Sequence, residues 1–123
     1  MNGKKALFDS NIIIYLSKRE IDLSYIDQFD ELFISVITYM EILGYSFTNV
    51  EEEKFIRKLL SIFHIVFINQ TIADLTIEIR KTRRIKLPDA VILATAVAEN
   101  IQLVSRDVDD FSNIDVKVLN PFE

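Results

Sequence analysis

The sequence contains no cysteine and only one histidine in 123 residues. Without cysteine the chain cannot form a disulfide bond or a thiolate metal site, and it has no thiol nucleophile. A serine–histidine triad would need His64 beside an activated serine, but no Gly-x-Ser-x-Gly elbow is present. We therefore assign His64 no role and look for chemistry that needs neither side chain.

Glycine and proline are also scarce, with two of each. Gly3 and Gly44 cannot make the glycine-rich motif of a dinucleotide site or a P-loop. The same scarcity leaves little room for flexible linkers. Because a chain of this length can bury one core, we expect a single domain over residues 1–123.

No apolar run has the length of a membrane span. The longest, around residues 90–98, is far shorter than the ~20 residues that a span needs. Asp9 interrupts the apolar stretch after Lys4 and Lys5, which makes that stretch a poor signal peptide. We expect a soluble, cytoplasmic protein without a membrane partner.

Short apolar runs alternate along the chain with segments of helical periodicity. The runs predict strands at residues 5–8, 32–37, 64–68, 101–104 and 116–119. The periodic segments predict helices through residues 12–16 and over 23–29, 38–46, 50–63, 72–84 and 90–99, the last opening at Pro88. This alternation predicts an α/β fold with a central, mostly parallel sheet of four to five strands, covered by helices on both faces.

Four acidic residues occupy positions where such a fold binds ligands, beyond the carboxyl ends of its strands. Asp9 follows the first strand, Asp107 follows the fourth, Glu41 lies one helical turn after the second, and Asp89 opens a helix. Each also has a purely structural explanation. Asp9 fits a helix cap, Thr38-x-x-Glu41 fits a capping box, Asp89 complements a helix dipole, and Asp107 fits a loop acid.

Taken together, the acids favour a metal site. They are embedded in apolar surroundings such as Leu7-Phe8-Asp9, although a helix cap does not require burial. Two carboxylates ~4 Å apart repel by about 4 kcal/mol at an effective dielectric near 20, so their convergence implies raised pKa values or bound cations. Oxygen ligands without histidine or cysteine select Mg²⁺ or Mn²⁺. Water activated by such an ion could hydrolyse a phosphodiester.

The ordered set of motifs resembles the PIN-domain family. These motifs are Leu7-Phe8-Asp9-Ser10-Asn11, Thr38-x-x-Glu41, Leu87-Pro88-Asp89-Ala90-x-Ile92-x-Ala94 and Leu103-Val104-Ser105-Arg106-Asp107-x-x-Asp110-Phe111. Their order and spacing are similar to those of VapC-type toxins over essentially the whole chain. The resemblance implies a PIN-like three-layer α/β/α fold and a Mg²⁺- or Mn²⁺-dependent endoribonuclease, the toxin of a type II toxin–antitoxin pair.

The resemblance also implies roles for individual residues. Asp9, Glu41 and Asp89 would be catalytic metal ligands. The last acidic ligand would be Asp107, with Asp110 as the second choice and Asp109 as a further candidate. The supporting polar residues would be Ser10, Asn11, Thr38 and Ser105.

Residues 80–86 form a basic run without an acid, although the net charge of the chain is −5. On its own this run fits a solvated helix end equally well. Under the resemblance, its cations would hold RNA phosphates beside the metal: Arg80, Lys81, Arg83, Arg84 and Lys86. The resemblance further implies a cognate antitoxin and a homodimer. Helix residues such as Ile12, Ile13, Tyr15, Tyr39 and Tyr45 would serve these contacts or, for most of them, the core.

Two other interpretations stay open. The first is a phosphohydrolase with Asp9 as a covalent nucleophile, although Asn11 stands where a haloacid-dehalogenase Asp-x-Asp motif has its second acid. The second is a non-catalytic PIN-like binding module with an inactive site. The RNA target is not encoded in any motif, because recognition depends on groove shape and flanking contacts.

Overall fold

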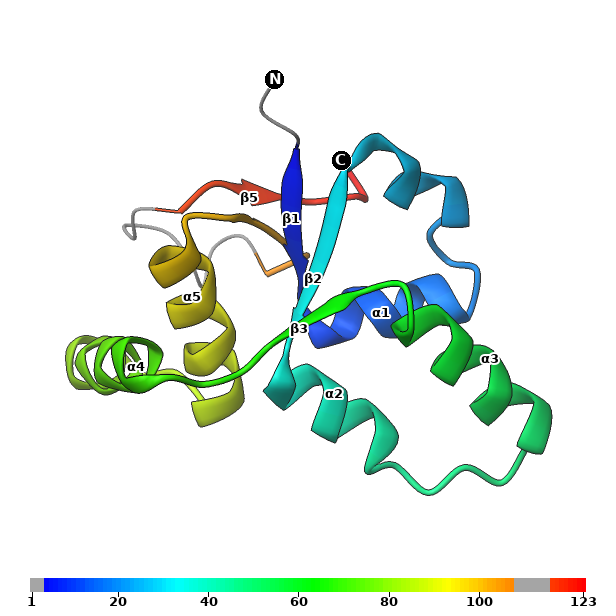
Figure 1. The fold of residues 1–123 in the computed structure, drawn as a ribbon, viewed down its shortest axis with the longest axis horizontal. Coiled ribbons are helices and arrows are strands. Elements are labelled where there is room, and N and C mark those ends of the chain that lie inside the picture. Colours follow the sequence, from blue (N-terminus) through cyan, green and yellow to red (C-terminus); the bar gives the residue numbers. More distant parts are fainter. Residues whose placement is uncertain (1–3, 108–115) are drawn as a thin grey trace.

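The computed structural model describes residues 4–107 and 116–123. This part of the chain forms a five-stranded parallel sheet with the order β3-β2-β1-β4-β5 (Figure 1). The strands are β1 (Lys5–Phe8), β2 (Glu31–Ser35), β3 (His64–Val66), β4 (Gln102–Val104) and β5 (Val118–Leu119). From β1 the chain builds outward to β2 and β3 on one side, then to β4 and β5 on the other. The expected α/β fold class is confirmed.

Helices cover both faces of this sheet. They are α1 (Ser10–Ser17), the 3₁₀ helix η1 (Leu23–Gln28), α2 (Val36–Leu43), α3 (Val50–Leu60), α4 (Gln70–Thr82) and α5 (Leu87–Glu99). Figure 1 shows α4 and α5 on one side of the strands and α1 and α3 on the other. The side chains of β1 alternate between the two layers, with Ala6 and Phe8 in one core cluster and Leu7 in another. The molecule is therefore a three-layer α/β/α sandwich.

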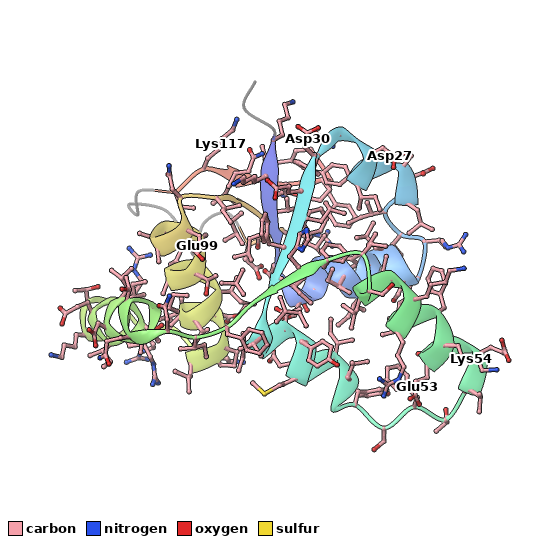
Figure 2. The ribbon with its side chains drawn as sticks, in the orientation of Figure 1. Asp27, Asp30, Glu53, Lys54, Glu99 and Lys117 are labelled. Carbon is pink, nitrogen blue, oxygen red and sulfur yellow. The ribbon has the colours of Figure 1, made fainter. Side chains whose placement is uncertain are left out.

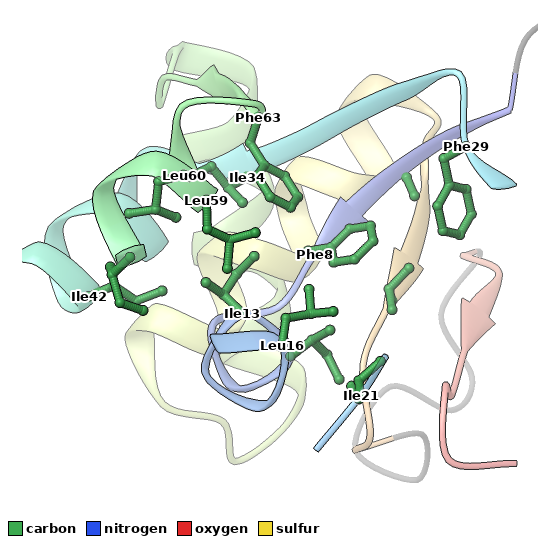
Figure 3. Close-up of a cluster of buried hydrophobic side chains, with 14 residues drawn as sticks. Phe8, Ile13, Leu16, Ile21, Phe29, Ile34, Ile42, Leu59, Leu60 and Phe63 are labelled. Atoms are coloured by element: carbon green, nitrogen blue, oxygen red, sulfur yellow. The ribbon is translucent and has the colours of Figure 1, made fainter. Parts of the chain in front are cut away.

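Phe8 is the centre of the larger core cluster, on the α1 and α3 side (Figure 3). Its fully buried ring makes edge-to-face contacts with Phe63 at 5.2 Å, Phe29 at 5.7 Å and Tyr25 at 6.4 Å between ring centroids. Such aromatic pairs stabilise a core beyond their buried area. Because Phe8 is the last residue of β1, this packing fixes the position of the backbone at the next residue, Asp9.

Helix α5 is the most deeply buried helix on the opposite face. Every residue from Ala90 to Ala96 is buried, because the helix lies between the sheet and α4. A helix that is apolar all round needs such a double-sided environment. Asp89, in the first turn of α5, is therefore carried by a firmly packed helix.

Many charged side chains lie on the surface, among them those labelled in Figure 2: Asp27, Asp30, Glu53, Lys54, Glu99 and Lys117. Ion pairs on the surface, such as Arg57 with Glu53 at 3.0 Å, add little to stability. In the part of the chain that the structure describes, no helix is long and apolar enough to cross a membrane.

Helix α2 begins earlier than the sequence predicted. The strand expected over residues 32–37 ends at Ser35, whose hydroxyl accepts a hydrogen bond from the backbone N–H of Ile37 at 3.1 Å. Ser35 is thus the N-cap, and Thr38 lies within the helix. The capping-box interpretation of Thr38-x-x-Glu41 is wrong, because a cap three residues upstream already begins the helix.

Other boundaries differ by a few residues. The segment expected as a helix over residues 23–29 is the 3₁₀ helix η1, and the third and last strands are shorter than predicted. Helix α4 spans Gln70–Thr82 rather than residues 72–84. Ile12 and Ile13 are fully buried and belong to the core, so they do not form a contact surface.

Candidate active site

The strand order creates a switch point at the carboxyl ends of β1 and β4. Phe8 of β1 pairs with Val104 of β4, so the residues that follow them, Asp9 and Ser105, are neighbours. The backbone N–H of Asp9 donates to the carbonyl oxygen of Val104 at 3.0 Å. Open α/β sheets bind ligands at such a reversal of strand order.

Asp9 combines two roles that the sequence left as alternatives. It is the N-cap of α1, because its Oδ1 accepts from the backbone N–H of Asn11 at 3.3 Å. Its Oδ2 accepts from the hydroxyl of Ser105 at 2.8 Å. Unlike an ordinary surface cap, the residue is only 4% exposed. Asp9 is therefore both a helix cap and a buried carboxylate at the switch point.

Burial raises the pKa of Asp9 above its ordinary value of 3.8. The hydrogen bonds from Ser105 and from the Asn11 backbone lower the pKa, while the negative charges of Asp89 and Asp107 raise it further. Three predicted site acids are thus close enough to interact electrostatically. A cation bound among them would favour the ionised form of Asp9 and offset both unfavourable effects.

Ser105 links Asp9 to the loop that follows β4. Its fully buried hydroxyl donates to Asp9 and accepts from the backbone N–H of Asp107 at 3.1 Å. Both bonds hold the loop against the end of β1. The side chain of Asp107 is exposed, on the solvent side of this bridge.

A second hydrogen-bonded group connects α1 with α2. The hydroxyl of Ser10 lies 2.9 Å from the hydroxyl of Thr38 and 2.9 Å from Oε1 of Glu41. Because Glu41 only accepts when ionised, Ser10 donates to it and is free to accept from Thr38. Thr38 is fully buried and Glu41 is exposed. The buried Thr38 therefore orients the accessible carboxylate of Glu41 through the hydroxyl of Ser10.

The predicted site residues come together in part. Ser10, Asn11, Thr38 and Ser105 all take part in hydrogen bonds that involve Asp9 or Glu41 or that lead to them. Within residues 4–107 and 116–123, no three acidic or histidine side chains form a ready-made metal-binding group. Asp89 is half-buried in the first turn of α5. Asp109 and Asp110 lie outside the described residues.

The donor set fits a hard divalent cation. Asp9 and the two acids that interact with it, Asp89 and Asp107, offer carboxylate oxygens. Hydroxyl and backbone N–H groups hold the oxygens of Asp9 and Glu41. Mg²⁺ binds through one or two protein carboxylates and keeps several waters, so it does not need a closed protein cage. A site with one buried and several accessible carboxylates is consistent with that preference.

The basic run borders a surface hollow next to the start of α5. Arg80 and Lys81 belong to the last turn of α4, and the other cations of the run follow it. The hollow has a volume of about 570 Å³ and is lined by Thr76, Ile77, Arg80, Lys81, Arg83, Arg84, Ile85 and Leu87. Lys86 is the N-cap residue of α5. The run therefore ends three residues before Asp89.

A second hollow, of about 360 Å³, lies between α1, α2 and α3. Ser10, Asn11 and Glu41 line it together with the side chains of Ile14, Tyr45, Phe47 and Ile56, among others. The candidate site is thus continuous with a partly apolar groove. Sequence reasoning missed one neighbour of the site, Arg106, which was part of a quoted motif but had no assigned role. Its only signal was its place between Ser105 and Asp107.

Comparison with known proteins gives the same family. The sequence matches the PIN domain family over residues 6–117. A chain of a toxin–antitoxin complex from Klebsiella pneumoniae is 35% identical, with a TM-score of 0.77, and the match covers 96% of this chain and 98% of that one. A chain of VapBC-1 from nontypeable Haemophilus influenzae is 25% identical, with a TM-score of 0.83 and coverage of 97% and 99%.

FitAcB from Neisseria gonorrhoeae shares the fold, with 23% identity, a TM-score of 0.77 and coverage of 96% of this chain and 99% of that one. No curated protein matches the sequence. The family match spans most of the chain and includes the ends of β1 and β4, where the candidate site lies. The chain therefore belongs to the PIN domain family, as a VapC-type member.

Proposed function

We propose that this protein is a divalent-metal-dependent endoribonuclease and the toxin of a toxin–antitoxin pair. The observation that carries the proposal is Asp9, a buried carboxylate at the switch point whose pKa is raised by burial and by Asp89 and Asp107. A buried charge among like charges is unfavourable unless it is protonated or paired with a cation. Family membership and the 35% identity to a chain of a toxin–antitoxin complex support this proposal.

Asp9, Glu41, Asp89 and Asp107 would hold Mg²⁺ or Mn²⁺, with Asp110 as the alternative to Asp107. All are oxygen ligands of the kind that these ions prefer. When bound, the ion would supply Lewis-acid stabilisation and an activated water for hydrolysis of a phosphodiester. The remaining work falls to the chain itself, which must keep these carboxylates ionised, oriented and beside the RNA.

Two hydroxyl bridges would orient the acids. Ser105 donates to one oxygen of Asp9 and Asn11 donates to the other, so the carboxylate is held and both bonds favour its ionised form. Ser10 donates to Glu41 and is itself in contact with the buried Thr38. Groups that orient ligands in this way typically contribute 10–100-fold to metal affinity or activity, on the order seen for outer-shell partners.

The basic run would bind the RNA backbone. Arg80, Lys81, Arg83 and Arg84 line one hollow, and Lys86 follows them toward Asp89. Cations that contact phosphates bring a nucleic acid to a protein whatever the sequence of the bases. A local positive surface beside bound metal ions would offset the overall charge of −5.

The groove beside Glu41 and the nearby exposed apolar side chains would serve a protein partner. Tyr39, Met40 and Tyr45 are 36%, 52% and 67% exposed on α2 and in the loop after it. Exposed apolar side chains gathered in one region mark protein contact sites. We assign this region to the cognate antitoxin, and we expect the toxin to form a homodimer, which its molar mass in solution would test.

The test compares RNA cleavage by the wild type, Asp9→Asn and Asp89→Asn with Mg²⁺ or Mn²⁺ and with EDTA. We expect cleavage only with metal, and losses in both variants larger than the roughly 10–100-fold of an outer-shell partner. Asp27→Asn is the matched control, because Asp27 is an exposed carboxylate at the periphery on η1 (Figure 2). Full cleavage by either site variant would remove that residue from the site. Partner binding without any wild-type cleavage would favour the non-catalytic module.

A further inference from the structure

Arg106 lies against two aromatic rings directly beside the candidate site. Its guanidinium carbon is 4.4 Å from the ring centroid of Phe122 and 5.6 Å from that of Tyr15. One of its nitrogens, Nη1, donates to the hydroxyl of Tyr15 at 3.2 Å. The two rings meet edge to face, with their centroids 5.0 Å apart. We call these three residues the Arg106 platform.

Within the described part of the chain, Arg106 contacts aromatic rings and a hydroxyl rather than an acid. Among residues 4–107 and 116–123, the salt bridges involve other cations, and the partners of Arg106 are the two rings and a neutral hydroxyl. Arg106 is exposed, and Phe122 is 42% exposed. The platform therefore presents a planar cation, supported by an aromatic ring, at the surface of the protein.

This platform is one residue away from the hydrogen bonds that hold Asp9. Arg106 follows Ser105, whose hydroxyl donates to Oδ2 of Asp9 at 2.8 Å. It precedes Asp107, whose backbone N–H donates to the same hydroxyl. The guanidinium also contacts Tyr15, six residues after Asp9 on α1, so the platform lies about 9 Å along that helix from the carboxylate, within reach of the same short single strand.

We propose that the Arg106 platform binds a nucleobase of a single-stranded RNA, next to the phosphodiester at the carboxylates. This inference rests on the proposed ribonuclease function and specifies where one base of the substrate binds. Unstacked bases of single strands stack on aromatic rings and on the guanidinium planes of arginine. The bases of a duplex are already stacked on one another, so a continuous duplex cannot use this platform.

The geometry favours a base over a phosphate as the occupant. Recognition of a phosphate by arginine is strongest when the N–H fork is free to make two parallel bonds. Here Nη1 donates to Tyr15, so one of the two edges that could hold a phosphate is partly used, and the guanidinium lies over the ring of Phe122. These contacts fix the orientation of the plane, and a fixed planar cation suits stacking. The basic run, which precedes Asp89 in the chain, would supply cations for the phosphates.

The test measures binding of single-stranded 2′-O-methyl oligonucleotides, which resist cleavage, in EDTA. One 2-aminopurine is placed at each position in turn, because its fluorescence reports stacking. With the wild type we expect one position to change its fluorescence strongly on binding. Arg106→Lys, which keeps the charge, and Phe122→Leu, which keeps the bulk, should lose that signal and bind about tenfold more weakly. Their dependence on salt should stay the same, because no cation is removed.

Arg19→Lys is the matched control, because Arg19 is another exposed arginine over an aromatic ring, 5.1 Å from the centroid of Phe55, and has no role in the proposed site. This variant should keep the 2-aminopurine signal. Circular dichroism would confirm that each variant is folded. Unaltered fluorescence and affinity in both Arg106→Lys and Phe122→Leu would overturn the platform while leaving the nuclease intact. If the wild type binds no oligonucleotide, the proposed RNA-binding function fails and the platform fails with it. Tighter binding of a blunt duplex than of the single strand would also contradict the inference.

Discussion

Asp9→Asn should make the metal-free protein more stable at neutral pH, although it disables the proposed site. The substitution keeps the shape of the side chain and removes its charge. Because burial raises the pKa of Asp9 in the folded state, ionised Asp9 destabilises the metal-free fold relative to the unfolded chain. Most substitutions of a buried, hydrogen-bonded residue have the opposite effect.

The expected magnitude follows from the hydrogen bonds of Asp9. A buried polar group without good hydrogen-bond partners lowers the free energy of unfolding by about 1–3 kcal/mol, and a buried charge lowers it more. Removing the charge of Asp9 should therefore regain about 1–3 kcal/mol of stability. Asparagine caps helices as well as aspartate does, so the bond from the Asn11 N–H survives. The hydroxyl of Ser105 loses its carboxylate acceptor, which costs about 1 kcal/mol. A net gain near 1 kcal/mol would raise Tm by roughly 3–5 °C in a domain of this size.

The pH determines how far Asp9→Asn stabilises the metal-free protein. For an acid whose pKa is raised by folding, the stabilising contribution of the bound proton is complete below the unfolded pKa of 3.8. That contribution disappears as the pH rises through the folded pKa. The Tm difference between Asp9→Asn and wild type should therefore be largest at pH 7 and should shrink toward pH 4.

Thermal unfolding followed by circular dichroism in EDTA at pH 7, 5 and 4 provides the measurement, with Asp27→Asn as the control carboxylate. A saturating divalent ion should raise the Tm of the wild type above that of Asp9→Asn, since a ligand at 100 times its Kd stabilises the protein that binds it by about 2.7 kcal/mol. If Asp9→Asn melts below the wild type in EDTA at pH 7, or if the difference ignores pH, the electrostatic reasoning is refuted.

Three further predictions follow from the hydrogen bonds and the basic run. Ser105→Ala should lower Mn²⁺ affinity about 10–100-fold in isothermal titration calorimetry, and unchanged affinity would contradict its orienting role. The double variant Arg80→Gln, Arg84→Gln should raise KM for RNA with little change in kcat and reduce the slope of log affinity against log salt by about 1–2. An unaltered slope would indicate that RNA binds at another surface of the protein. Ser35→Ala should destabilise the protein by about 1 kcal/mol in urea unfolding, and a neutral result would argue against the cap of α2.

The fold could be predicted because its signals are local. The short apolar run that ends at Phe8 and the long apolar helix after Pro88 each show within about ten residues of sequence. The boundary between β2 and α2 was misplaced for a local reason too. Val36 and Ile37 are β-branched and resemble strand residues, but the hydroxyl of Ser35 caps helix α2, so these two residues are the start of the helix.

The site could be predicted only in outline. Asp9 and Asp107 stand out because they follow strands, and the topology rule for parallel sheets places strand ends together. The partners of those acids depend on strand order and register, which no local pattern contains. Only the pairing of β1 with β4 brings Ser105 to Asp9, and only the C-terminal packing brings Phe122 to Arg106. Long-range contacts of this kind are decided by tertiary packing.

The bond between Asp9 and Ser105 spans 96 positions along the chain. A growing polypeptide on a ribosome emerges from its N-terminus, and contacts between distant segments form later than contacts within a segment. The capped end of α1 exists early in synthesis, but its buried carboxylate acquires a neighbouring hydroxyl only when β4 has emerged and paired. Under the proposed function, a chain built in this order would lack its complete site while it is nascent, and a product of interrupted translation that ends before β4 would be inactive.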